Sequence, residues 1–147
     1  MAQIRQSAVT LRLMGDDLVP DEVTALLGTS PSRAHVKGET GKHIIGPKVG
    51  GVRVARSGMW ILDISDREPE DMNSQIEEIL GRMTNDLSIW QSIIKRFRVD
   101  LFCGLWLSGE EGGMSLSAQS LTALGERGIE LAMCIYGDHD NEQYNEH

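Results

Sequence analysis

One pattern of secondary structure occurs twice along the chain. Residues 8–28 read AVTLRLMGDDLVPDEVTALLG, and residues 101–125 read LFCGLWLSGEEGGMSLSAQSLTALG. Each segment has an apolar strand pattern, a loop with two adjacent acids, a short helix and a closing Leu-Gly. Each is followed by a second apolar run, at 59–65 and 129–137. Two β-α-β units in a chain of 147 residues restrict the possible folds strongly and leave room for a single domain.

Local signals place the individual elements. Alternating apolar and polar residues predict a half-buried strand at 8–14, and Pro20 opens a helix because proline has no amide hydrogen to lose in the first turn. Gly28 ends that helix, and two more helices are predicted after Pro69 and Asp86, where apolar residues recur at helical spacing. The other predicted elements are short strands near 43–45 and 52–55, strands at 59–65, 98–107 and 129–136, and a helix after Ser117.

These elements predict the fold class. Their order, β-α-(β-β)-β-α-α-β-α-β, indicates an α+β fold and, in finer detail, a ferredoxin-like sandwich built from two β-α-β units. Each crossover should be right-handed, which lays the helices on one face of a mostly antiparallel sheet. The whole chain, 1–147, is predicted to form one domain with a core at about 8–137 and a polar tail at 138–147.

Charge and hydropathy limit the class of protein. A formal net charge of −8 argues against nucleic acid as a partner, because phosphate contacts need a basic surface. No apolar run approaches the ~20 residues of a membrane span, and the first residues lack the apolar core of a signal peptide. We therefore expect a cytoplasmic protein without membrane contact. Cys103 and Cys134 should leave opposite faces of the sheet, which predicts free thiols in a reducing compartment.

Strand alternation divides the sheet residues into two faces. The face predicted to lie under the helices carries Val9, Leu11, Leu13, Trp60, Leu62, Ile64, Val99, Leu101, Cys103, Leu105, Ile129, Leu131, Met133 and Ile135. The opposite face carries Thr10, Arg12, Met59, Ile61, Asp63, Arg98, Asp100, Phe102, Trp106, Glu130, Cys134 and Tyr136. Large aromatics among polar side chains are typical of an association surface, for a protein partner or a second copy of the chain. The alternative is that the basic hairpin, or the stems of long charged side chains, cover these aromatics.

Residues 33–56 form a basic, glycine-rich segment in an otherwise acidic chain. Six basic residues and one acid give the segment a net charge of +5, while the rest of the chain carries −13. Exposed backbone amides and basic side chains suit an anion or an acidic partner. In that case the side chains of Arg33, Lys37, Lys42 and Arg53 should converge near the first helix or the Lys-Gly-Glu turn. The alternative is a solvated hairpin that neutralises acids elsewhere in the molecule, since the segment has no phosphate-loop signature.

Residues able to do chemistry are few. His35 and His43 do not match a zinc-ligand spacing and are interpreted as a surface pair on a loop. Paired acids occur in equivalent loops of the two units, at 16–17 and 110–111, where solvation and helix capping are the simpler roles. No serine, threonine or cysteine has a recognisable nucleophile context. The sequence predicts no catalytic residues, metal or cofactor, and an enzyme that uses the Asp16/Asp17 loop is the less favoured alternative.

A set of short motifs runs through the chain. They are Gly15-Asp16 after the first strand, Leu18, Pro20 and Val23 around the helix start, Leu27-Gly28 with Pro31, Lys37-Gly38-Glu39, and Gly58 with Trp60. Together with the closing GIELAMCIYGD, these motifs resemble those of a bacterial family, domain of unknown function 4279, over about residues 8–138. The resemblance implies a single bacterial cytoplasmic domain. It implies no activity and no catalytic residues.

The sequence therefore favours a non-catalytic binding or protein-interaction module. An acidic single-domain protein with aromatics on an open sheet face would suit a basic protein or a second copy of itself. A small-anion or metabolite-sensing domain is the alternative, in which the basic segment holds the anionic group. The candidate binding residues are Arg33, Lys37, Glu39, Arg53, Asp16, Phe102, Trp106 and Tyr136.

Overall fold

The computed structural model describes residues 3–137, so the predicted polar tail at 138–147 lies outside the described residues. The helices are α1 (Pro20–Leu27), α2 (Met72–Gly81), α3 (Leu87–Arg96) and α4 (Ala118–Arg127). The strands are β1 (Gln6–Gly15), β2 (Arg33–His35), β3 (Lys48–Val49), β4 (Val52–Arg53), β5 (Gly58–Asp63), β6 (Arg98–Trp106) and β7 (Glu130–Tyr136). The hairpin strand expected near 43–45 lies at 48–49, and α2 begins at Met72 instead of directly after Pro69. None of these described helices has the length and hydropathy to cross a membrane.

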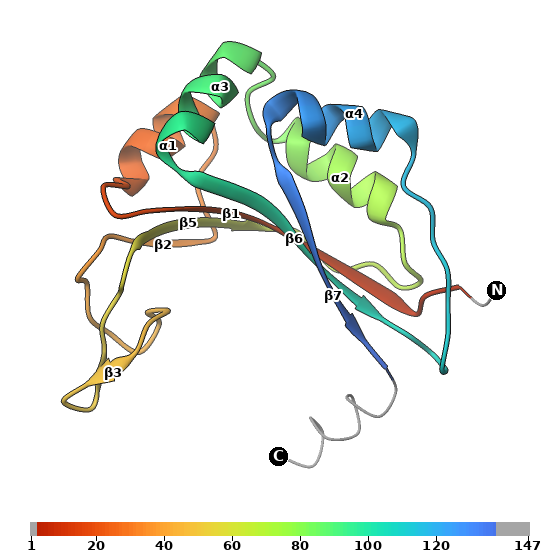
Figure 1. Ribbon diagram of the computed structural model, residues 1–147, viewed down its shortest axis with the longest axis horizontal. Coiled ribbons are helices and arrows are strands. Elements are labelled where there is room, and N and C mark those ends of the chain that lie inside the picture. Colours follow the sequence, from red (N-terminus) through yellow and green to blue (C-terminus); the bar gives the residue numbers. More distant parts are fainter. Residues whose placement is uncertain (1–2, 138–147) are drawn as a thin grey trace.

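A single five-stranded sheet organises the described part of the chain. Its strand order is β2-β5-β1-β6-β7, and all neighbours are antiparallel except β6 and β7, which are parallel. The helices α1 to α4 lie on one face of this sheet (Figure 1). The prediction of an α+β fold, with a mostly antiparallel sheet that carries its helices on one face, is therefore confirmed.

The two repeated segments do not form equivalent units. In the second segment, α4 connects the parallel neighbours β6 and β7, as expected. In the first segment, β1 and β5 are antiparallel neighbours, and α1 leads from β1 to the short strand β2. The chain then returns through β5 between β1 and β2, so the expected β-α-β unit made of β1, α1 and β5 is wrong. The ferredoxin-like sandwich, the finer expectation, is not confirmed.

The main core lies between the sheet and the helices. Trp60 on β5 has no solvent exposure, and its Nε1 donates a hydrogen bond to Thr24 Oγ1 of α1 at 3.0 Å. Leu11 and Leu13 of β1 are likewise fully buried, as strand alternation predicts. Removing such apolar side chains from water is the main favourable contribution to folding. The prediction that Trp60 belongs to the core is confirmed.

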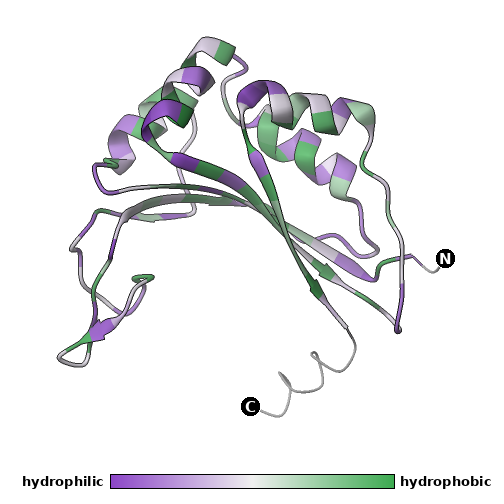
Figure 2. Ribbon diagram, in the orientation of Figure 1, coloured by the Kyte–Doolittle hydropathy of each residue, from purple (hydrophilic) through white to green (hydrophobic). Residues whose placement is uncertain are grey.

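The helix-side face of β7 departs from the prediction. Strand alternation places Met133 and Ile135 under the helices, yet they are 51% and 58% exposed. Figure 1 shows that β7 begins beside the C-terminal end of α4 and then slants away from the helices, so its later residues lie further from them. Figure 2 shows β7 mostly in the colours of apolar residues. An apolar strand surface therefore faces solvent at this edge of the sheet.

The opposite face of the sheet is covered at one end. Met59 and Ile61 of β5, predicted to lie on the open face, are buried. The segment 36–57, which includes the β3–β4 hairpin, lies on this side of the sheet (Figure 1) and contributes the buried Ile44. Covering by the basic segment is thus found at β5. Phe102 on β6 stays partly exposed.

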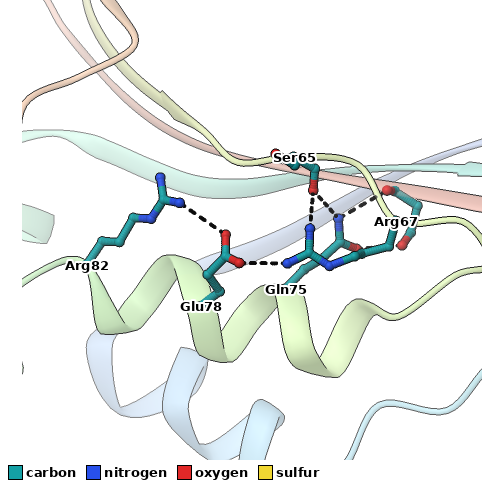
Figure 3. Close-up of polar contacts among 6 residues, drawn as sticks. Ser65, Arg67, Gln75, Glu78 and Arg82 are labelled. Atoms are coloured by element: carbon teal, nitrogen blue, oxygen red, sulfur yellow. Dashed lines mark hydrogen bonds and ion pairs between the residues drawn. The ribbon is translucent and has the colours of Figure 1, made fainter.

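A buried polar network holds α2 against β1. Gln75 of α2 has no solvent exposure, and its Nε2 donates to the carbonyl oxygens of Ser7 and Ser65 at 3.1 and 3.2 Å. Arg67 extends the network by donating to Ser65 O at 2.9 Å and to Glu78 at 2.6 Å (Figure 3). Buried polar groups are tolerated when they find hydrogen-bond partners, as Gln75 does here. The network therefore has a structural role.

Candidate functional site

The predicted basic site does not form one cluster. Arg33 lies 3.5 Å from Asp63, and Lys37 Nζ lies 3.2 Å from Asp16. Arg53 donates to a backbone carbonyl oxygen of its own hairpin region at 3.0 Å. The expected convergence of these side chains on one anion is not found. Pairing with the chain's own carboxylates is instead what the alternative of a self-neutralising hairpin predicts.

Two of the predicted site residues, Asp16 and Lys37, are brought together by the fold. Both side chains are exposed, so their ion pair contributes little to stability. Glu39 lies 3.7 Å from His43 and takes no part in this pair. Within residues 3–137, no group of three histidine, cysteine, aspartate or glutamate side chains is arranged to hold a metal ion.

His35 is buried, which corrects its interpretation as a surface loop residue. It ends β2 opposite Met59 of β5, and its side chain is almost fully enclosed. Neither ring nitrogen has a hydrogen-bond partner among the described residues. The segment 36–57 folds back on this end of the sheet, and tertiary coverage of that kind leaves no local sequence signal.

The predicted aromatic surface divides into two parts. Trp106 and Tyr136 lie opposite each other on β6 and β7, and their rings stack with centroids 5.1 Å apart. Gly104 makes room for this stack, because a Cβ at that position would lie 2.7 Å from the Trp106 ring. Phe102 belongs to a separate contact, in which the Arg12 guanidinium lies over its ring at 4.6 Å. The stacked pair therefore lies where the last two strands, β6 and β7, end.

Arg12 forms a two-pronged ion pair on the open face. Its Nε and Nη2 donate to the two carboxylate oxygens of Asp100 at 2.8 and 2.6 Å. The Asp100 side chain is only 1% exposed. The hydrogen bonds to Asp100 raise the pKa of Arg12 above its usual value, although partial burial acts in the opposite direction. This pair joins β1 to β6 on the open face, and its two charges neutralise each other.

The two edges of the sheet differ in how well they are protected. β2 has only three residues, of which Arg33 is charged, whereas β7 has seven residues and a single charge, Glu130. Proteins protect sheet edges with short strands and charges because an unpaired row of N–H and C=O groups can recruit another strand. β2 follows this rule and β7 does not. No strand of the described residues pairs with the outer side of β7.

A groove that the sequence did not indicate lies between α2 and α4. Its volume is about 660 Å³, which is within the range of small-molecule sites. Ile76, Glu77 and Leu80 line it from α2, and Ala123 and Arg127 line it from α4. The helical periodicity of α2 identifies Ile76 and Leu80 as apolar positions, but it cannot show that α4 leaves them a space. A basic residue in the last turn of a helix is common, so the sequence does not distinguish Arg127 from an ordinary helix end.

Comparison with known proteins adds the family. The family described as "Domain of unknown function (DUF4279)" matches residues 3–138. The chain belongs to this family. In this DUF4279 domain the motif residue Gly58 pairs with Gly15 across β1 and β5, and a Cβ on Gly58 would lie 2.8 Å from Gly15 O. Gly58 therefore allows β5 to approach the β1–α1 corner closely, whereas the absence of a side chain at Gly15 makes room for the Phe97 ring. Comparisons with curated proteins and with solved structures gave no match.

Both cysteines are free thiols in the structure, as predicted, and their reactivities should differ. Cys103 is fully buried, and burial raises the pKa of its thiol from 9.0 to about 12, whereas Cys134 is partly exposed. Because the thiolate is the reactive form, iodoacetamide at pH 8 should label Cys134 alone in the folded protein and both thiols after denaturation. Mass spectrometry without reductant measures this. Rapid labelling of Cys103 in the folded state, or a thiol that reacts only after reduction, would contradict the assignment.

Proposed function

We propose that this DUF4279 domain is a non-catalytic protein-interaction module that pairs with a second copy of itself through the outer edge of β7. The observation that carries the proposal is the exposure of Met133 and Ile135 on an edge strand of seven residues. An exposed apolar edge of this length normally recruits another strand. The neighbouring Trp106–Tyr136 stack adds an aromatic surface of the kind that is enriched in interfaces.

Charge favours a second copy over a basic partner. Glu130 is the only charged residue of β7, and it already faces Arg98 at 3.9 Å. The rest of the strand carries no charge, so a basic protein would find no carboxylate to bind along it. A second copy with the same net charge of −8 can approach this strand without placing like charges opposite each other.

The geometry of an antiparallel pair suits a two-fold dimer. Two copies of β7 related by a two-fold axis expose the same backbone groups to each other, which makes the contact self-complementary. On the helix side, Met133 and Ile135 of one copy would meet the same residues of the other. Continuation of the sheet across the axis would bury apolar surface that is now in water.

The strand order also supports a finer description of the fold. We infer that the chain from β1 to β6, without the β3–β4 hairpin, forms a ferredoxin-like sandwich. The strand order β2-β5-β1-β6 supports this, because it places β5 between β1 and β2 and places β1 between β5 and β6. In this description α4 and β7 are an addition at one edge. An added edge strand is where a homodimer contact would arise.

Sedimentation velocity tests the proposed dimer. The wild-type protein is expected to sediment as a dimer of the 16.2 kDa chain, and Ile135→Lys is expected to be monomeric because it places a charge in the contact. Val49→Lys is the matched control, because Val49 is exposed on β3, away from β7, and should leave the dimer intact. Circular dichroism confirms that both variants are folded.

Two results would overturn the proposal. One is a wild-type protein that remains monomeric at its highest soluble concentration. The other is a dimer that survives Ile135→Lys but is lost in Val49→Lys, since that would place the contact on the basic hairpin.

A further inference from the structure

The groove between α2 and α4 is built by two parallel helices. Asn73 Oδ1 near the start of α2 accepts hydrogen bonds from Ser117 N and Ser120 Oγ at 2.9 and 2.8 Å, so the two helices begin side by side. Figure 1 shows both helices on the same face of the sheet. The polar atoms at this end already bond to one another and need no ligand. Arg127 comes seven positions after Ser120 in α4, which puts it about 10 Å further along the groove.

Arg127 is the unusual residue at the other end. Its side chain is only 10% exposed, and its Nη1 donates to Ala123 O at 2.9 Å. Its Nε is buried and has no hydrogen-bond partner among residues 3–137. Both hydrogen bonds that Arg127 makes to described residues use Nη1, so Nη2 takes part in neither. The nearest carboxylate, that of Glu126, reaches only Nη1, at 3.5 Å. Leaving such a donor buried without an acceptor is unfavourable.

The same edge of a guanidinium is satisfied elsewhere in this protein. Arg12 uses Nε and Nη2 as a fork that holds the two oxygens of the Asp100 carboxylate. Within residues 3–137, no hydrogen bond reaches the Nε/Nη2 edge of Arg127, and Arg127 lines a groove that opens to solvent. A planar carboxylate is the group that fits such a fork with two parallel hydrogen bonds.

The remaining groove wall defines the rest of the ligand. Ile76 and Leu80 of α2 are buried apolar residues that line the groove, and Ala123 lies opposite on α4. Glu77 of α2 also lines the groove and would repel a carboxylate placed toward the helix starts. A ligand would therefore place its charge at Arg127 and its apolar part toward Ile76.

We propose that the α2–α4 groove binds a small organic carboxylate, with the carboxylate on the Nε/Nη2 edge of Arg127 and an apolar stem along Ile76, Leu80 and Ala123. This site is separate from the β7 edge and goes beyond the proposed pairing. It also differs from the basic segment, where the sequence placed the anionic ligand.

An NMR titration of the ¹⁵N-labelled chain with octanoate tests the proposal. Octanoate should cause saturable shifts at Gly81, Ala123 and Arg127. Octanol lacks the carboxylate and acetate lacks the apolar stem, so each should bind at least about tenfold more weakly than octanoate. Arg127→Gln should weaken octanoate binding by about tenfold, because it removes a charged hydrogen-bonding partner. Ala123→Leu, which keeps Arg127 and fills the groove, should weaken binding as well.

Arg82→Gln is the matched control. Arg82 is an exposed arginine of the α2 end that pairs with Glu78 and does not line the groove, so its loss should leave octanoate binding unchanged. The proposal is wrong if octanoate causes no saturable shifts, if octanol binds as tightly as octanoate, or if Arg127→Gln binds like the wild type. Amide spectra with the wild-type dispersion show that each variant is folded. Dimer formation is measured separately, so failure here leaves the β7 contact untouched.

Discussion

Replacing Trp60 with alanine is expected to lower the free energy of unfolding by about 3–5 kcal/mol. The indole is fully buried between β5 and α1, where its Nε1 donates to Thr24 Oγ1. The substitution removes the apolar contacts of the largest side-chain type and leaves a cavity that the surrounding helices and strands fill only in part. Urea denaturation followed by circular dichroism measures the effect.

Trp106→Ala provides the matched control for this prediction. Trp106 is partly exposed on the other face and stacks on Tyr136, so its loss should cost about 1–2 kcal/mol. Equal losses in the two variants would show that burial between sheet and helices does not distinguish the two tryptophans. A Trp60→Ala protein as stable as the wild type would remove Trp60 from the core.

Replacing Arg12 with methionine is expected to lower the free energy of unfolding by about 3 kcal/mol, because it leaves the Asp100 carboxylate buried without its cation. Asp100 is 1% exposed and receives both hydrogen bonds of the Arg12 fork. Arg33→Met is the control, since Arg33 and Asp63 form an exposed pair that should contribute about 0–1 kcal/mol. Urea denaturation of the three proteins measures the difference.

A double variant separates loss of the ion pair from loss of packing. Arg12→Met combined with Asp100→Leu replaces both partners of the pair by apolar side chains, and it should recover most of the stability lost in Arg12→Met. A double variant that is less stable than Arg12→Met would indicate that the side-chain shapes, and not the unpaired charge, cause the loss. A negligible effect of Arg12→Met alone would show that water reaches Asp100 freely.

Short-range patterns predicted the elements correctly where the signal is local. Pro20 and Gly28 begin and end α1 because each acts on its own backbone, and Gly28 has the left-handed φ of 78° that favours glycine. Alternation along β1 placed Leu11 and Leu13 in the core because neighbouring side chains of a strand point to opposite faces. The three residues of β2 were missed, since a strand this short has no measurable alternation.

The candidate sites were predicted less well because they depend on which segments meet. The basic residues Arg33 and Lys37 were expected to serve one anion, yet the fold gives each a carboxylate of its own from a distant part of the chain. His35 was interpreted as a loop residue because the residues next to it in the sequence do not indicate that the segment 36–57 folds back over this end of the sheet. In the sequence, Arg127 is only a basic residue in the last turn of a helix. The structure shows that it lines the α2–α4 groove and that its buried Nε has no hydrogen-bond partner among the described residues.

The sequence by itself determined the four helices and the longer strands to within a few residues, which side of each of these strands is apolar, and that Trp60 is a core residue. Periodicity and backbone preferences act over a few residues, so a short stretch of sequence is enough to recognise them. Only the tertiary structure decided that Met133 and Ile135 are exposed, that Met59 and Ile61 are buried, and that α2 and α4 leave a groove. Alternation assigns a side chain to a face, but solvent exposure depends on whether another element lies on that face. The packing of distant segments sets that coverage.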